Sequence, residues 1–394
     1  MVNDITGNRL MLAKTFKGLE EVLAKELIEL GADDVQIERR AVSFTGDRAL
    51  LYRANLCLRT ASRVLVPIKK QSCDGSKPDD WLYEMVRAVN WAEYMTSDTT
   101  FSIDTTVYSD VFRNSRFVTY RVKDAIVDWW IDKEGKRPNV KVTAPDLYIN
   151  VHIANKTVTI SLDSSGESLH KRGYRVANTE APINEALAAG MLLMAGWQGQ
   201  SDLYDPMCGS GTIPIEAALI ARNIAPGVFR QSFAFEKWKD FDPELWNEIY
   251  NDDSQEREFE HKIYGSDASF YAIQQATKNI KAAGVSKDVE LKQIRLEEVK
   301  DVNADGALVM MNPPYGERLK SNKEMEDLYA AIGTTLKHQF TGATAWIISS
   351  NVEAMKRIGL KPSKKYHLLN GELDCQFNKY ELFHGKRNEA HLYS

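Results

Sequence analysis

The feature that most constrains the fold is a regular alternation of strands and helices through the C-terminal half of the chain. Each short apolar strand is followed by a longer helix before the next strand begins. This rhythm predicts a parallel sheet, because the helices return the chain to the starting edge and cover both faces. The predicted pairs are Leu203–Tyr204 with Thr212–Arg222, Lys262–Ser266 with Tyr271–Ala283, Ala307–Met311 with Met325–Phe340, and Ala343–Ser349 with Val352–Ile358.

The end of this half departs from the alternation. Lys365–Phe383 is typical of two strands joined at Asn370-Gly371, and Asn-Gly favours a tight turn between antiparallel strands. An antiparallel hairpin that closes a doubly wound parallel sheet is unusual. It therefore narrows the fold to a Rossmann-like α/β domain with an antiparallel terminal hairpin.

The N-terminal half mixes strands and helices less regularly. Residues 1–60 are typical of a small α/β piece, and residues 61–165 of a second compact α/β module. Ser164–Arg175 is polar, basic and contains glycine, so we expect a linker over residues 166–180 before a domain at 181–394. The predicted elements are Leu10–Thr15, Leu19–Leu30, Ala41–Thr45, Ala49–Leu58, Ala61–Ile68, Asp80–Ala88, Thr100–Tyr108, Arg116–Ile131, and a hairpin of Asp146–Ala154 and Thr157–Asp163.

Charge is distributed unevenly along the 394 residues. Lys and Arg number 50 and Asp and Glu 55, for a net charge of −5. Residues 1–180 hold 26 basic and 25 acidic side chains, which leaves 24 and 30 for the remainder. A uniformly basic nucleic-acid coat is therefore excluded, and a polyanionic partner is expected to meet the first half.

Neither a membrane span nor a metal site is expected from the sequence. The longest apolar run, Ala186–Trp197, has 12 residues, whereas a spanning helix needs about 20. No apolar stretch typical of a signal peptide follows Met1. The four cysteines form no C-x-x-C pair and have no histidine cluster beside them, so we expect a reducing, cytoplasmic location and no disulfide or zinc site.

The first chemical motif, DPMCGSGT at Asp205–Thr212, lies between a predicted strand and a predicted helix. Glycines at such a junction let the backbone approach a ligand closely. The motif matches neither the Walker phosphate loop nor G-x-G-x-x-G. A glycine turn that only connects two elements is the structural alternative.

The second motif is Asp267, at the end of the next strand. A carboxylate in that position can accept hydrogen bonds from both hydroxyls of a ribose. Asp267 also directly precedes a predicted helix, so a simple helix N-cap is an alternative interpretation.

The third motif, Asn312-Pro313-Pro314-Tyr315-Gly316, follows the strand Ala307–Met311. The two prolines fix the backbone and remove two N–H donors. Backbone carbonyls and the Asn312 side-chain oxygen can then accept hydrogen bonds from an exocyclic amine, and Tyr315 can stack on a planar base. A proline-rich turn alone would need neither the asparagine nor the aromatic residue.

These motifs end successive strands, and together they resemble the class I S-adenosylmethionine-dependent methyltransferases that modify exocyclic amines of nucleic-acid bases. The segments LHKRGYR (Leu169–Arg175), APINEALAAG (Ala181–Gly190) and NPPYGERL (Asn312–Leu319) further resemble THUMP-containing RNA methyltransferases, above all the RlmL-type 23S rRNA guanine-N2 enzymes. The resemblance covers nearly the whole chain. It implies a ferredoxin-like domain at 1–60 and a THUMP RNA-binding domain at 61–165.

The resemblance also implies roles for individual residues. Asp205 and the loop Cys208–Gly211 would hold the methionine part of the cofactor, Asp267 its ribose, and Asn312 with the Pro313 carbonyl the target amine. Tyr315 would stack on the base, and Ile183 and Asn184 would cover the cofactor. The implied site comprises Asn312, Pro313, Pro314 and Tyr315 for catalysis, and Ile183, Asn184, Asp205, Pro206, Met207, Cys208, Gly209, Gly211, Thr212, Asp267 and Ala268 for the cofactor.

Other segments are less specific. Many amino-methyltransferases carry an acidic or amide residue after the third strand to bind the adenine amine, but here that stretch reads Gln293-Ile294-Arg295-Leu296. Residues 225–262 form an aromatic-rich insertion that is either a lid near the base pocket or a small packed cap; we favour the cap. Basic residues that could follow an RNA backbone, or simply form a solvated face, are Arg113, Arg116, Arg121, Lys123, Lys171, Arg172 and Arg175.

The leading expectation is an enzyme that methylates guanine N2 in 23S rRNA. A tRNA substrate stays open, because THUMP domains also serve tRNA enzymes. DNA adenine-N6 methylation is another alternative, since the Asn-Pro-Pro-Tyr motif suits either amine. A non-catalytic RNA-binding ribosome assembly factor is the alternative outside enzymes, and the intact ligand motifs argue against it.

Overall fold

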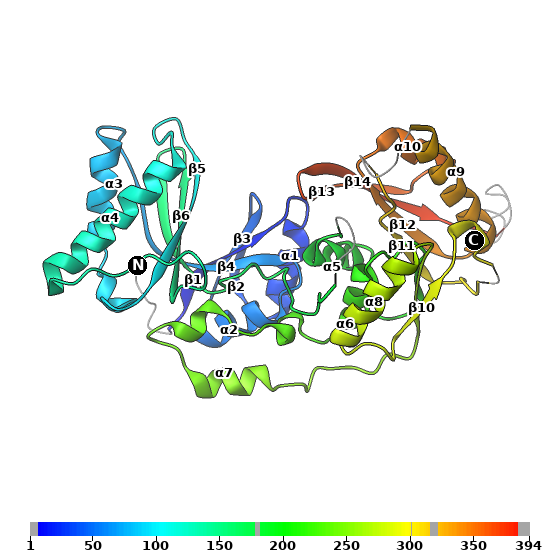
Figure 1. Ribbon diagram of the computed structural model, residues 1–394, viewed down its shortest axis with the longest axis horizontal. Helices are drawn as coiled ribbons and strands as arrows, with labels where there is room; N and C mark the ends of the chain where they lie inside the picture. Colours follow the sequence, from blue (N-terminus) through cyan, green and yellow to red (C-terminus); the bar gives the residue numbers. More distant parts are fainter. Residues whose placement is uncertain (1–6, 178–181, 301, 316–321, 385–394) are drawn as a thin grey trace. The chain divides into compact units, whose positions relative to one another are not determined.

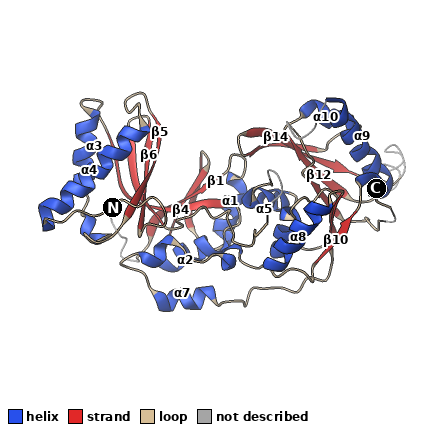
Figure 2. Ribbon diagram, viewed as in Figure 1, coloured by secondary structure: helices blue, strands red, loops and turns tan. Residues whose placement is uncertain are grey.

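The computed structural model describes residues 7–177, 182–300, 302–315 and 322–384. It divides into two units that each combine separate stretches of the chain: 1–15, 24–169 and 230–251 in the first, and 16–23, 170–229 and 252–394 in the second. Each unit is built around one seven-stranded sheet (Figures 1 and 2).

The sheet of the first unit has the order β2-β3-β1-β4-β7-β6-β5, in which only β5 and β6 pair in parallel. The strand β4 pairs with β1 along one edge and with β7 along the other, so residues 1–60 and 61–165 share one continuous sheet. The strands are β1 (Arg9–Thr15), β2 (Asp33–Glu38), β3 (Ala41–Gly46), β4 (Ala61–Ser72), β5 (Phe101–Tyr108), β6 (Leu147–Ala154) and β7 (Thr157–Asp163).

Local signals set the helices of the first unit. The Asn114 side chain accepts a hydrogen bond from Phe117 N at the start of α4, and Gly135 ends that helix in the left-handed conformation with φ +67°. The helices are α1 (Glu20–Glu29), which passes from the second unit into the first, α2 (Arg48–Cys57), α3 (Pro78–Arg87), α4 (Ser115–Glu134) and α7 (Pro243–Tyr250), with 3-10 turns Trp91–Glu93 and Ala234–Lys237.

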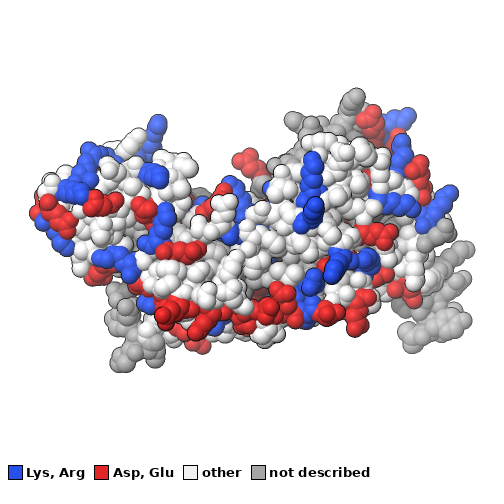
Figure 3. All heavy atoms as spheres, turned by 60° about the horizontal axis from the view of Figure 1, so that its bottom comes forward, with Lys and Arg blue, Asp and Glu red and all other residues white. Residues whose placement is uncertain are grey.

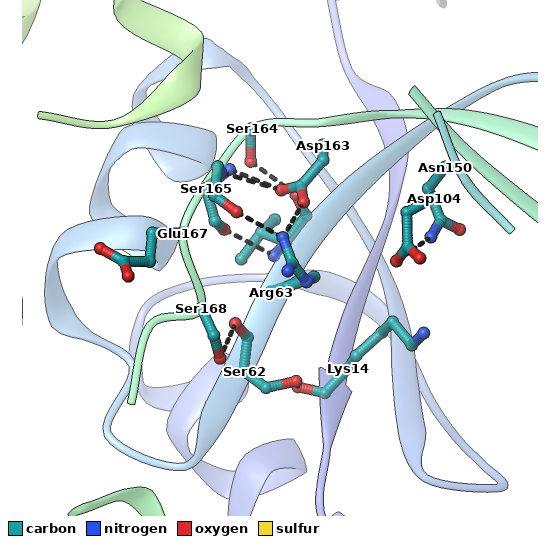
Figure 4. Close-up of polar contacts among 12 residues, drawn as sticks. Lys14, Ser62, Arg63, Asp104, Asn150, Asp163, Ser164, Ser165, Glu167 and Ser168 are labelled. Atoms are coloured by element: carbon teal, nitrogen blue, oxygen red, sulfur yellow. Dashed lines mark hydrogen bonds and ion pairs between the residues drawn. The ribbon is translucent and has the colours of Figure 1, made fainter. Parts of the chain in front are cut away.

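The polar segment that begins at Ser164, just before the expected linker, is held against β4. The Ser164 hydroxyl donates to the Val64 carbonyl (2.6 Å), and the Ser165 hydroxyl accepts from Val64 N (2.9 Å). Arg63 forms an ion pair with Asp163, as Figure 4 shows. The polar composition that suggested a linker therefore reflects hydrogen bonds to the sheet as far as Leu169, where the first unit's main stretch ends.

The central part of the aromatic insertion, residues 230–251, packs within the first unit. Tyr52 of α2 stacks on Phe235 with ring centroids 4.5 Å apart, and Trp246 meets Phe235 edge-on at 5.0 Å. The Tyr52 hydroxyl also accepts a hydrogen bond from Asp242 N at 2.9 Å. The packed-cap interpretation is confirmed, because Phe233, Phe235 and Trp238 are buried.

The second unit has the predicted doubly wound sheet, in the order β10-β9-β8-β11-β12-β14-β13. The first five strands are parallel, and β14 and β13 form the predicted antiparallel hairpin, in which Asn370 pairs with Leu373. The strands are β8 (Leu203–Asp205), β9 (Ile263–Asp267), β10 (Val289–Gln293), β11 (Leu308–Met311), β12 (Thr344–Ser349), β13 (Lys364–Asn370) and β14 (Leu373–Glu381).

Helices cover both faces of this sheet. Met310 and Ile348 belong to one buried cluster and their strand neighbours Val309 and Ile347 to another, as expected when alternate side chains face opposite sides. Within the described ranges no helix has the length and apolar character needed to cross a membrane. The helices are α5 (Glu185–Met194), α6 (Thr212–Ala221), α8 (Phe270–Ala282), α9 (Asn322–Gln339) and α10 (Val352–Arg357), with 3-10 turns Pro226–Phe229 and Leu296–Glu298.

Candidate functional site

The three motifs follow neighbouring strands at one edge of the second sheet. The strand β8 lies between β9 and β11 and runs parallel to both. Because parallel strands end at the same edge, Asp205, Asp267 and Asn312 are placed side by side there. Ligands of open α/β sheets bind at this edge.

The loop after β8 has the conformation that its glycines allow. Gly209 and Gly211 adopt positive φ angles of 54° and 83°, a region that other residues rarely enter. Cys208 N donates to the Ser266 carbonyl of β9 at 2.9 Å, which ties the loop to the neighbouring strand. A Cβ on Gly211 would lie 3.2 Å from the Ala276 Cβ of α8. The loop is thus a close-packed cradle, and α6 begins immediately after it at Thr212.

Asp267 connects the two adjacent strand ends. Its carboxylate accepts hydrogen bonds from Gly209 N at 3.1 Å and from Ser269 N at 2.9 Å. The N-cap of α8 is Ser269, whose hydroxyl accepts from Ala272 N. The helix-cap interpretation of Asp267 is therefore wrong, because the helix begins two residues later than that interpretation required.

Asp205 is a buried carboxyl, with 1% of its surface exposed. Met207 N donates to it at 3.2 Å. Burial, with the negative charge of Asp267 as a further cause, raises the pKa of Asp205 well above its ordinary value. A cationic ligand group bound here would lower that pKa again, so the carboxyl is suited to hold the ammonium group of an amino acid.

We expect Asp205→Asn to stabilise the ligand-free protein increasingly as pH rises. The pKa of Asp205 is higher in the folded protein than in the unfolded chain. The parent protein therefore has its full stability below the unfolded-state pKa and loses part of it as pH rises toward the folded-state pKa. The amide cannot ionise and can still accept from Met207 N. Thermal unfolding of both proteins from pH 4 to pH 8 measures this effect. A difference in midpoint that does not change with pH would contradict it.

The Asn312 side chain carries an unused acceptor. Its Oδ1 is buried and has no hydrogen-bond partner among the described residues, although leaving such an atom unpaired costs about 1–3 kcal/mol. The following residues, Pro313 and Pro314, have no N–H to offer it. An amine donor from a ligand would satisfy this atom, so the site fits an exocyclic amino group.

Tyr315 lies differently from the expectation. It is 5% exposed, and its hydroxyl accepts a hydrogen bond from the Asn370 amide at the tip of the terminal hairpin. Base stacking therefore stays a prediction, and it requires the ring to leave this position. Asn370 was not expected near the motif; only the turn signal at Asn370-Gly371 marked it. Gly316–Leu319 lie outside the described residues.

The predicted basic residues fall into different environments. Arg113 and Arg116 are exposed near the start of α4, whereas Arg121 is paired with Asp80 and Lys123 with Asp124. Lys171 is exposed in the second unit. Acidic side chains gather along the lower edge of the view in Figure 3. The segment around α7 also holds four acidic residues, Asp240, Asp242, Glu244 and Glu248.

Arg172 requires a correction. It is 1% exposed and forms a buried ion pair with Glu216 of α6, so the expectation that it contacts an RNA backbone is wrong. Burying a cation is costly unless a carboxylate pairs with it, which explains the partner. Arg175 is also mostly covered, and its guanidinium contacts Ser210 and Thr212 beside the glycine loop.

The remaining predicted cofactor residues lie around the same edge. Ile183 is buried, and Asn184 caps α5 by accepting from Ala186 N and Leu187 N. No cluster of metal-ligating side chains occurs within the described ranges. Pro206, Met207, Cys208, Gly209 and Gly211 occupy the loop after β8, Thr212 begins α6, and Ala268 follows Asp267 after β9.

Comparison with known proteins decides the family. A family model described as the RMKL-like methyltransferase domain matches residues 172–379. The chain belongs to the RMKL-like methyltransferase family. Two further models match this methyltransferase, the RlmL ferredoxin-like domain at 11–65 and the THUMP domain at 79–163. The enzyme is therefore an S-adenosylmethionine-dependent methyltransferase with an RNA-binding THUMP domain, and the expected fold is confirmed.

Individual relatives agree with this assignment. The methyltransferase is 40% identical to slr0064 of Synechocystis sp., provisionally named an RNA methyltransferase, over 94% of this chain and 96% of the relative. It is 40% identical to the ribosomal RNA large subunit methyltransferase K/L of Syntrophotalea carbinolica over 93% of this chain, but it spans only 52% of that relative. The structure of SMU.472 complexed with SAH superposes with a TM-score of 0.86 at 31% identity, over 96% of this chain and all of the other.

Proposed function

We propose that this methyltransferase transfers a methyl group from S-adenosylmethionine to the exocyclic N2 amine of a guanine in 23S rRNA. The observation that carries the proposal is the buried Oδ1 of Asn312, which has no hydrogen-bond partner among the described residues. It lies at the strand edge that also holds the glycine loop and Asp267. The names of the K/L relatives support a large-subunit rRNA substrate, although the chain spans about half their length. The THUMP domain supports RNA over DNA.

The chain's own residues bind the cofactor, orient the target amine and exclude water from the site. S-adenosylmethionine supplies a methyl group already activated on a sulfonium. Asp205 and Asp267 would hold the cofactor with the glycine loop, while Asn312 and the Pro313 carbonyl would accept both hydrogens of the target amine. Those two acceptors direct the nitrogen lone pair toward the methyl group and stabilise the positive charge that grows on nitrogen. A guanine paired in a helix must be flipped out or already unpaired to enter this site.

Cys208 has no nucleophilic role in this proposal. Burial raises the pKa of its thiol well above the ordinary value, and the carboxylates of Asp205 and Asp267 raise it further. The thiolate is the reactive form of cysteine, so this site suppresses it. Direct transfer to the amine also needs no covalent intermediate.

The proposal predicts N2-methylguanine as the product in 23S rRNA. Purified enzyme is incubated with S-adenosylmethionine carrying a labelled methyl group and with unmodified 23S rRNA, 16S rRNA, tRNA or duplex DNA. Digestion to nucleosides and mass spectrometry identify the product, and Asn312→Ala enzyme is the background control. Label in tRNA alone, or N6-methyladenine in DNA, would overturn the assignment to 23S rRNA.

A further inference from the structure

We propose that Arg175 is a positioning residue for the cofactor loop. Its guanidinium donates to the Ser210 hydroxyl at 3.1 Å and to the Thr212 hydroxyl at 2.9 Å. It also donates to the Ile183 carbonyl at 3.1 Å and pairs with Glu185 at 2.7 Å. One side chain thus joins the glycine loop to the segment that enters α5. The proposal rests on cofactor binding and is independent of which RNA is methylated.

These contacts are suited to fix a loop geometry. The side chains of Arg175 and Glu185 are 14% and 7% exposed, so their pairing is largely removed from water. An arginine fork presents several N–H donors in fixed directions. It therefore constrains Ser210 and Thr212, on the two sides of Gly211, relative to Ile183. The loop backbone between them is the part expected to contact the cofactor.

A second anchor lies on α8. The amide of Asn279 donates to the Ser210 carbonyl at 3.0 Å and to the Ala177 carbonyl at 2.8 Å. Its side-chain oxygen accepts from Val176 N and Ala177 N, both at 3.0 Å. Asn279 is 1% exposed. The glycine loop is therefore tied to residues 175–177 both by the arginine and through this buried amide.

The residues before Arg175 are themselves fixed to the unit; we call Arg172–Ala177 the strap. Arg172 and the Tyr174 hydroxyl both bind Glu216 of α6. Gly173 has φ +112°, and a Cβ there would lie 2.1 Å from the Phe229 carbonyl oxygen. Contacts with α6 and with the glycine loop thus explain why these four residue types stand at Arg172, Gly173, Tyr174 and Arg175. Because the strap fixes the conformation of the glycine loop, cofactor binding and docking of the strap stabilise each other.

The test measures cofactor affinity directly. Binding of S-adenosylhomocysteine to the full-length enzyme is followed by calorimetry for Arg175→Gln and Arg175→Lys. We expect Arg175→Gln to weaken binding at least about tenfold, as the loss of charge-assisted hydrogen bonds implies. Arg175→Lys keeps the charge but not the fork, so its loss is smaller. In steady-state assays the weaker cofactor binding of both variants raises KM for S-adenosylmethionine and leaves kcat at saturating cofactor largely unchanged.

Arg222→Gln is the matched control. Arg222 is a partly covered arginine that pairs with Asp288 at 3.6 Å at the opposite end of α6. Its substitution is expected to lower the thermal midpoint of the cofactor-free enzyme without changing cofactor affinity. If Arg175→Gln does not fold, Ser210→Ala removes one acceptor on the loop and should weaken affinity in the same direction. Unchanged cofactor affinity in folded Arg175 variants, together with weaker RNA binding, would overturn the proposal in favour of RNA contact.

Discussion

Asn312→Ala is expected to slow methyl transfer about 100-fold or more in a single turnover, because it removes a preorganised acceptor aimed at developing charge. The affinity for S-adenosylhomocysteine should change little. The Oδ1 atom of Asn312 has no partner among the described residues, so its loss breaks no internal hydrogen bond. An interaction made mainly in the transition state affects kcat more than binding. Rapid-quench measurements on one RNA substrate give both the rate of methyl transfer and its saturation with substrate.

Asn351→Ala is the control for this variant. Asn351 also follows a parallel strand of the same sheet, where its side chain caps α10 by accepting from Ala354 N at 2.9 Å. Its loss should cost about 1 kcal/mol of stability and leave the transfer rate unchanged. If Asn312→Ala transferred methyl groups as fast as the parent enzyme, the motif would be structural and the proposed function would lose its main support.

Asp267→Ala is expected to weaken cofactor binding by about tenfold to 100-fold in calorimetry, since hydrogen bonds to charged groups contribute about 1.5–3 kcal/mol. Two losses combine in this variant. The ribose would lose its carboxylate acceptor, and Gly209 N would lose the oxygen 3.1 Å away that holds the loop. Asp267→Asn keeps one acceptor oxygen and should lie between the parent and the alanine variant.

Asp202→Ala provides the comparison at the opposite edge. Asp202 precedes β8, and its carboxylate accepts from Lys262 N at 2.9 Å. The Asp202→Ala substitution is expected to reduce the stability of the protein and to leave its cofactor affinity intact. Equal losses of affinity in the Asp202 and Asp267 variants would mean that the effect comes from the sheet as a whole, and the ribose assignment would then be wrong.

The sequence predicts those elements whose apolar pattern matches their burial. β11 and β12 are almost entirely buried, and their apolar runs identify them. In contrast, β2 (DDVQIE) and β10 (VELKQ) are edge strands with mostly polar side chains. Neither was among the predicted elements, because their mostly polar composition gives no strand signal and composition does not report the backbone pairing that holds them.

The candidate site was predictable in its motifs but not in its supporting contacts. Asp205 and Asp267 end their strands and Asn312 directly follows one, so the topology alone brings them together. Arg172 was misjudged because charge in a polar segment is typical of a solvated surface, whereas its partner Glu216 lies 44 residues later. Such a pairing is a tertiary contact, and nothing in the local sequence distinguishes it.

The excursion of residues 230–251 into the first unit has a consequence for the order of events during synthesis. Protein domains generally form as their residues emerge from the ribosome. Here, however, the ring of Tyr52 stacks on Phe235 and meets Trp246 edge-on, and these two residues are made 183 and 194 residues later. The first unit therefore remains unfinished until residues 170–229 of the second unit have also been translated. A nascent chain arrested near residue 170 should expose this aromatic surface to chaperones, and one arrested well past residue 251 should bury it.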